Sequence, residues 1–139
     1  MTLMDAQPVD QVRLRRRRLL LISALVIAIL AISLYLYWPY YRARQTVNQF
    51  MSALIRHNYQ EAYYLWQADP KLYPMNTFMR DWGPQSEWGY IRSYKIEAVT
   101  VPPGGHASGL VVLVKINGIP HEEKIWVENH SEAMSYYEF

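Results

Sequence analysis

The sequence predicts an α+β protein with a single N-terminal transmembrane helix, then about three helices, then an antiparallel sheet of three to four strands. A twenty-residue apolar run near the N-terminus predicts the first helix. After it, apolar residues recur every three or four positions, and later every second position, which indicates helices followed by strands. Helices that precede strands, instead of alternating with them, are typical of the α+β class.

Charge and composition limit the function classes. The formal net charge of +2 resides in an N-terminal arm, residues 1–18, because residues 44–139 hold eight Lys and Arg against ten Asp and Glu. A nucleic-acid-binding domain would carry its basic residues on a folded face, so we expect no nucleic-acid partner. Without cysteine the chain has no disulfide, no thiolate nucleophile and no cysteine-based metal site.

The apolar run "LLLISALVIAILAISLYLYW", residues 19–38, carries no charge. At about 1.5 Å per residue it spans the roughly 30 Å hydrocarbon core of a bilayer. The run is longer than the apolar core of a cleaved signal peptide and lacks its small-residue cleavage site, so we expect a retained anchor. Aromatic residues that would lie at the membrane interface follow or end it: Tyr35, Tyr37, Trp38, Tyr40 and Tyr41.

The arginines on the two flanks predict the orientation. Five arginines precede the span, and only Arg42 and Arg44 follow it closely. Cytoplasmic flanks retain the excess of positive charge, so we expect the arm inside and the C-terminal domain outside, on the periplasmic side. The arginines expected at the membrane interface, where they can also meet anionic lipid headgroups, are Arg15, Arg16, Arg17 and Arg18.

A short juxtamembrane tether, residues 39–43, is expected before the outer domain, residues 44–139. The domain's first helix places Val47, Phe50 and Leu54 on one face, and Asn58 is expected to end it in a left-handed conformation. A second helix covers "YQEAYYLW", residues 59–66. A third, "FMRDW", is expected to be capped by Asn76 or Thr77 and ended by the Gly-Pro pair at 83–84.

Three later segments have the alternation of strands: residues 93–101, 107–116 and 122–128. "EAMSYYEF" at the C-terminus predicts a short fourth strand at an edge. The second segment is apolar on both faces, so it should be central. Asn117 and Gly118 predict a tight hairpin between the second and third strands, because both residues accept a positive φ.

Residues 43–135, with "NYQEAYYLW", "FMRDWGPQS" and "KIWVE", resemble the small membrane-anchored bacterial domains of the nuclear transport factor 2-like, cystatin-like superfamily. The resemblance implies a cone-like domain in which a curved sheet wraps a long helix. Such a cone can be an enzyme, a ligand pocket or an interaction module. The aromatic residues expected to form its core or line a pocket are Phe50, Tyr63, Trp66, Trp82, Tyr94 and Trp126.

The stretch "FMRDWGPQSEWGY", residues 78–90, raises the question of catalysis. Asp81 and Glu87 could form an acid–base pair if burial separated their pKa values. We expect instead that both acids are solvated or paired with Arg80 or Arg92, and that the stretch only separates a helix from a strand. The four histidines are scattered and form no metal motif, so no catalytic, cofactor or metal residue is predicted.

The leading interpretation is therefore a non-enzymatic, single-pass membrane protein that serves as an accessory or assembly subunit of a larger membrane complex. Its partners would be the lipid bilayer and other membrane protein subunits, and its high aromatic content, 14%, suits protein interfaces. A second interpretation is a domain that binds a small apolar ligand, and a third is an enzyme of the same cone fold. An open interior of about 300 Å³ or more would favour the ligand, and a filled one the interaction module.

Overall fold

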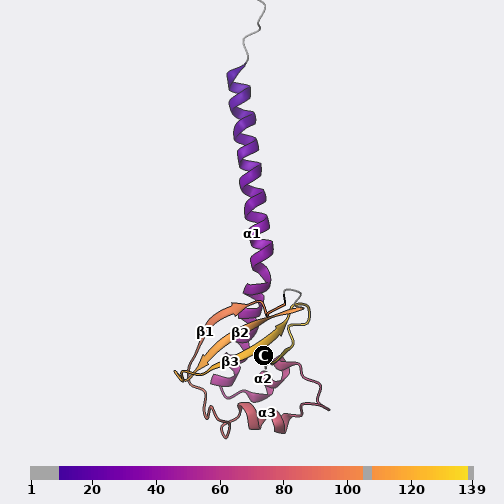
Figure 1. Ribbon diagram of the computed structural model, residues 1–139, viewed down its shortest axis with the longest axis vertical. Helices are drawn as coiled ribbons and strands as arrows, with labels where there is room; N and C mark the ends of the chain where they lie inside the picture. The colour runs from indigo at the N-terminus through magenta and orange to yellow at the C-terminus, as the bar shows by residue number, and fades with distance from the viewer. Residues whose placement is uncertain (1–9, 105–107, 138–139) are drawn as a thin grey trace, which may run out of the picture. The chain divides into compact units, whose positions relative to one another are not determined.

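The computed structural model describes residues 10–104 and 108–137 (Figure 1). It confirms the α+β class, with a long apolar helix, two short helices and an open four-stranded antiparallel sheet. The helices are α1 (Gln11–Ile55), α2 (Tyr59–Trp66) and α3 (Met75–Trp82). The strands are β1 (Tyr94–Thr100), β2 (Gly109–Ile116), β3 (Glu122–Glu128) and β4 (Met134–Tyr136). The predicted bounds of the second helix and third strand are those observed.

The chain divides into two compact units, Met1–Tyr37 and Trp38–Phe139, and α1 contributes to both. In the first unit, the helix is long and apolar enough to cross a membrane by length and composition, as a membrane anchor or a signal sequence would be. Every described side chain there is exposed. The Ser33 hydroxyl donates a hydrogen bond to the Ile29 carbonyl at 2.8 Å, which satisfies a polar group within the apolar run.

α1 continues through residues 39–43, where we expected a tether between two helices. Pro39 lies inside the helix, although a proline there removes one backbone hydrogen bond and its ring crowds the carbonyl four residues earlier. Tertiary contacts stabilise the following turns: Arg42 forms an ion pair with Glu132, in the turn between β3 and β4, and Ala43 and Thr46 are buried. The proline therefore does not separate the apolar helix from the helix of the domain.

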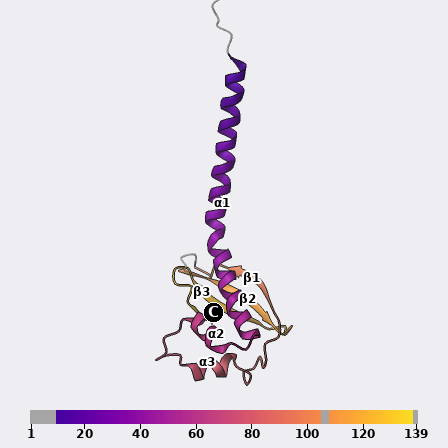
Figure 2. The same ribbon diagram turned by 180° about the vertical axis from the view of Figure 1, so that it is seen from behind.

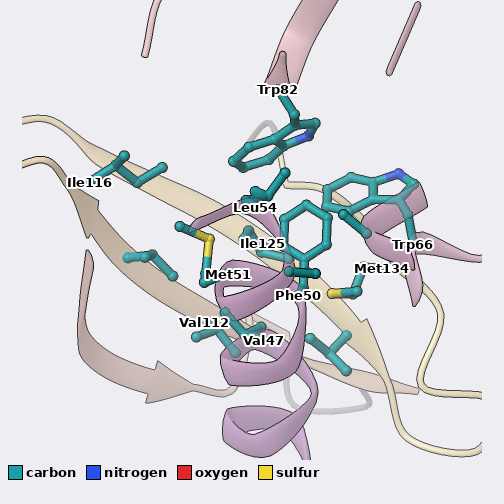
Figure 3. Close-up of a cluster of buried hydrophobic side chains, with 14 of the residues drawn as sticks. Val47, Phe50, Met51, Leu54, Trp66, Trp82, Val112, Ile116, Ile125 and Met134 are labelled. Atoms are coloured by element: carbon teal, nitrogen blue, oxygen red, sulfur yellow. The ribbon is translucent and has the colours of Figure 1, made fainter. Parts of the chain in front are cut away.

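The sheet has the order β1-β2-β3-β4, with β2 in the interior as predicted. Figures 1 and 2 show the last turns of α1 lying across one face of this sheet. Phe50 of α1 lies at the centre of the core, with ring centroids 5.0 Å from those of Trp66 and Trp82 (Figure 3). Other side chains buried around it are Val47, Met51, Leu54, Phe78, Val112, Val114, Ile116, Ile125 and Met134.

The ends of the short helices differ from two predictions. His57, not Asn58, has the left-handed conformation after α1, with φ of 59°. Asn58 instead caps α2, and its side chain accepts a hydrogen bond from the backbone of Glu61. Asn76 and Thr77 do not cap α3, because the helix begins earlier, after the extended residue Pro74, and includes them in its first turn.

The hairpin between β2 and β3 is confirmed, since Asn117 and Gly118 have φ values of 53° and 71°. Asn117 also holds the segment that precedes β1. Its side-chain oxygen accepts a hydrogen bond from the Arg92 backbone at 2.8 Å, and its amide donates to the carbonyls of Trp88 and Tyr90 at 3.1 Å. The segment after α3 is therefore fixed at its far end by a residue of the turn between β2 and β3.

Replacement of Gly83 by valine should destabilise the domain by about 2 kcal/mol, the usual cost of overpacking a buried site. A Cβ at Gly83 would overlap the carbonyl oxygen of Met79, which accepts the Gly83 N–H. Urea unfolding of the detergent-solubilised chain, followed by tryptophan fluorescence, measures the change. Gln85→Val, at an exposed position of the same loop, is the control. Equal midpoints for the two variants would contradict this account of Gly83.

Candidate functional site

An open cleft of about 500 Å³ lies beside the core of the domain. It is lined by Arg80, Asp81, Glu87, Trp88, Glu123, Tyr136 and Tyr137. Four of these residues belong to the stretch 78–90, which contains the end of α3 and the loop that follows. The other three come from the start of β3 and the region of β4. The stretch therefore ends a helix, as predicted, and also supplies more than half of a cleft lining.

Helix and strand periodicity place these side chains. In the last turn of α3, Trp82 is buried in the core, and its neighbour Asp81 is partly exposed and faces the cleft. On β3, Glu123 shares a face with the buried Ile125, because alternate residues of a strand point to the same side. Tyr136 stacks on Trp82, with centroids 6.0 Å apart and planes 4° from parallel. Through this stacking, the core residue Trp82 is in direct contact with Tyr136 of the cleft lining.

A chain of hydrogen bonds joins two residues of the cleft lining, Asp81 and Tyr136, through Tyr73. The Tyr73 hydroxyl donates to the Asp81 carboxylate at 2.8 Å, and the Tyr73 and Tyr136 oxygens are 3.2 Å apart. Since Tyr73 has only one hydroxyl proton, Tyr136 must donate to it, and the Tyr136 oxygen can then only accept further hydrogen bonds. Burial raises the pKa of both phenols, so both are neutral at physiological pH.

Of the three acids that line the cleft, only Asp81 has an ion-pair partner among the described residues. Arg80 forms an ion pair with Asp81 at 3.5 Å. Within residues 10–104 and 108–137, no side chain or backbone group donates a hydrogen bond to the carboxylate of Glu87 or Glu123. Burial raises the pKa of Glu123, the nearby charge of Glu87 raises it further, and His121 lowers it. Glu123 is therefore a half-buried carboxylate without a full counter-charge.

The six aromatic candidates fall into three environments. Phe50, Trp66 and Trp82 are buried together in the core. Tyr63 and Tyr94 are half-buried at its border, where their hydroxyls donate to the Tyr73 carbonyl at 2.7 Å and to Asn48 at 2.9 Å, respectively.

Trp126 lies elsewhere. It stacks on Tyr137 at 6.1 Å, and it belongs to the sheet face opposite the core, because its neighbours Ile125 and Val127 are the buried residues of β3.

The residues expected at the membrane interface all lie in α1, and their roles remain predictions: Arg15, Arg16, Arg17, Arg18, Tyr35, Tyr37, Trp38, Tyr40 and Tyr41. Tyr40 packs against the border of the domain core, and the rings of Trp38 and Tyr41 are 5.7 Å apart. At least Tyr40 therefore has a packing role in the second unit of the chain.

The sequence did not identify Tyr73, Glu123, Tyr136 or Tyr137 as site residues. Tyr73 lies in the loop before α3, and Tyr136 meets it from 63 positions further along the chain. No periodicity or motif links such distant positions. The chemistry of the completed cleft is negative charge and hydrogen-bond acceptance. In the part of the chain that the structure describes, no cluster of His, Asp and Glu could hold a metal ion.

Comparisons of the chain with protein-family models, with curated proteins and with solved structures found no match.

Replacement of Glu123 by glutamine should stabilise the domain at pH 7, by less than about 1 kcal/mol because solvent screens a half-exposed group. An acid with a raised folded-state pKa binds its proton more tightly in the folded protein, so stability falls as pH rises through its pKa. The gain over the parent chain should therefore vanish below the ordinary pKa of a glutamate. Thermal unfolding at pH 7 and pH 4 tests this, and a variant less stable than the parent at pH 7 would refute it.

Proposed function

We propose that the protein is a single-pass, membrane-anchored interaction module, an accessory or assembly subunit of a larger membrane protein complex. In this proposal residues 19–38 remain as the anchor, the arginine arm is cytoplasmic and the domain is extracytoplasmic. The domain is proposed to be a filled cone of the nuclear transport factor 2-like type.

The observation that carries the proposal is the filled space between α1 and the sheet. Phe50, Met51 and Leu54 are 0 to 1% exposed, and rings from α2 and α3 close over them (Figure 3). A pocket for a small ligand takes about 300 Å³ or more, and here that space holds side chains in contact with one another. Interactions of this domain are then expected at its surface.

The two other interpretations fit the geometry less well. A small apolar ligand needs apolar walls, whereas the cleft beside the core has three carboxylates and one guanidinium. An enzyme of this fold would use the chain of Asp81, Tyr73 and Tyr136. Burial raises the pKa of both phenols, which holds them in the protonated form and disfavours them as general bases near pH 7.

The surface also carries large apolar side chains that suit protein contacts. Tyr64 of α2 and Leu72 in the following loop are 80% and 84% exposed. A subunit that touches its complex through both a membrane helix and a domain gains effective concentration at each contact from the other. Two modest interfaces can then hold a lasting complex, which is the behaviour expected of an accessory subunit.

The proposal predicts that the outer domain carries most of the specificity for the partner. Residues 19–37 are replaced by an unrelated single span, and in a second chain residues 44–139 are deleted, which removes the buried α1 residues from Thr46 to Leu54 together with the sheet. After mild detergent extraction, the first chain should retain most co-purifying proteins and the second should lose them. The proposal would be overturned if the chain with the exchanged span lost its co-purifying proteins while the chain without residues 44–139 retained them.

A further inference from the structure

We infer that the cleft beside α3 binds the cationic end of an arginine or lysine side chain, presented by the membrane-protein partner. This inference rests on the proposed function and names the chemistry of the partner. It stands on three features of the cavity: the balance of charge in its lining, the direction of its hydrogen bonds, and its size and aromatic walls.

The lining has an excess of negative charge. Asp81, Glu87 and Glu123 face one guanidinium, that of Arg80, which is already paired with Asp81. Glu87 and Glu123 receive no hydrogen bond from the described residues, and Glu123 is half-buried. A partly buried charge without a partner destabilises the protein that holds it. The negative charges of Glu87 and Glu123 also repel each other. A cation that enters the cleft would offset this repulsion.

The hydrogen-bond chain also makes Tyr136, a neutral residue of the lining, a hydrogen-bond acceptor towards a ligand. The Tyr73 hydroxyl donates a hydrogen bond to the Asp81 carboxylate, and the Tyr136 hydroxyl donates one to the Tyr73 oxygen. The Tyr136 oxygen can then offer only lone pairs to a ligand, as the carboxylates do. Guanidinium and ammonium groups carry several donors and no acceptor, so they match this lining better than an anion, a carbonyl or an alcohol.

The size and walls of the cleft favour a side chain over a bare ion. A volume of about 500 Å³ holds the end of a long side chain together with part of its backbone. Trp88 and Tyr136 also line the cleft and offer apolar contact area to the stem of such a side chain.

The test uses the full-length chain in mild detergent and two double variants of equal net charge. Glu87→Gln with Glu123→Gln removes the two unpaired carboxylates of the cleft. The control variant, Glu97→Gln with Glu122→Gln, removes two carboxylates that lie outside the cleft lining. Of these, Glu97 forms ion pairs with Lys95 and Lys115. Co-purification of partner proteins and binding of a capped Ala-Arg-Ala peptide are measured, and the same peptide with neutral citrulline in place of arginine is the ligand control.

We expect the cleft variant to lose at least tenfold in partner recovery and peptide binding, while the control variant keeps both. This loss could not be ascribed to unfolding if thermal unfolding shows the cleft variant to be as stable as the parent. Equal recovery of the partner by the two variants, or equal binding of the arginine and citrulline peptides, overturns the inference. In that case the proposed function still stands if deletion of residues 44–139 releases the partner, and falls if the deletion does not.

Discussion

The packing of Phe50 against Trp66 and Trp82 is the contact on which the domain depends, because it joins α1, α2 and α3 at one point over the sheet. The same ring meets Phe78 at 6.2 Å, edge to face. One helix thus supplies the apolar run of the first unit and the central residue of the second. This packing fills the space between α1 and the sheet with side chains, so the interior of the domain contributes to its stability.

The cleft follows from this core. Trp82 belongs to the buried cluster on one side and stacks on Tyr136 on the other, so the core fixes the ring whose hydroxyl ends the hydrogen-bond chain. Asp81, the neighbour of Trp82, turns outward because successive helical residues point in different directions. The partly buried acid on β3 then adds a charge that the described part of the fold does not neutralise. The acidic cleft therefore depends on the geometry of the apolar core beside it.

Local signals in the sequence were enough for much of the fold. The bounds of α2, the central position of β2 and the turn at Asn117 were predicted correctly because each depends on neighbouring residues. Long-range contacts decided the rest. The helix passes through Pro39, with tertiary support for the turns beyond it, and Tyr73 and Tyr136 meet across 63 positions. Asp81 and Glu87 were recognised as candidates, but their cleft appears only when β3 and β4 are placed beside them.

The central claim is that the interior of the domain is a solid core centred on α1. The most direct measurement is urea unfolding of the full chain with Phe50→Ala, compared with Tyr64→Ala, which truncates an aromatic side chain that is 80% exposed. A filled core predicts a loss of about 3 to 5 kcal/mol for Phe50→Ala, from lost burial and the cavity left behind. Tyr64→Ala should leave the midpoint nearly unchanged. The same midpoint for both variants would contradict the claim, because it would mean that Phe50 does not hold the helices and the sheet together.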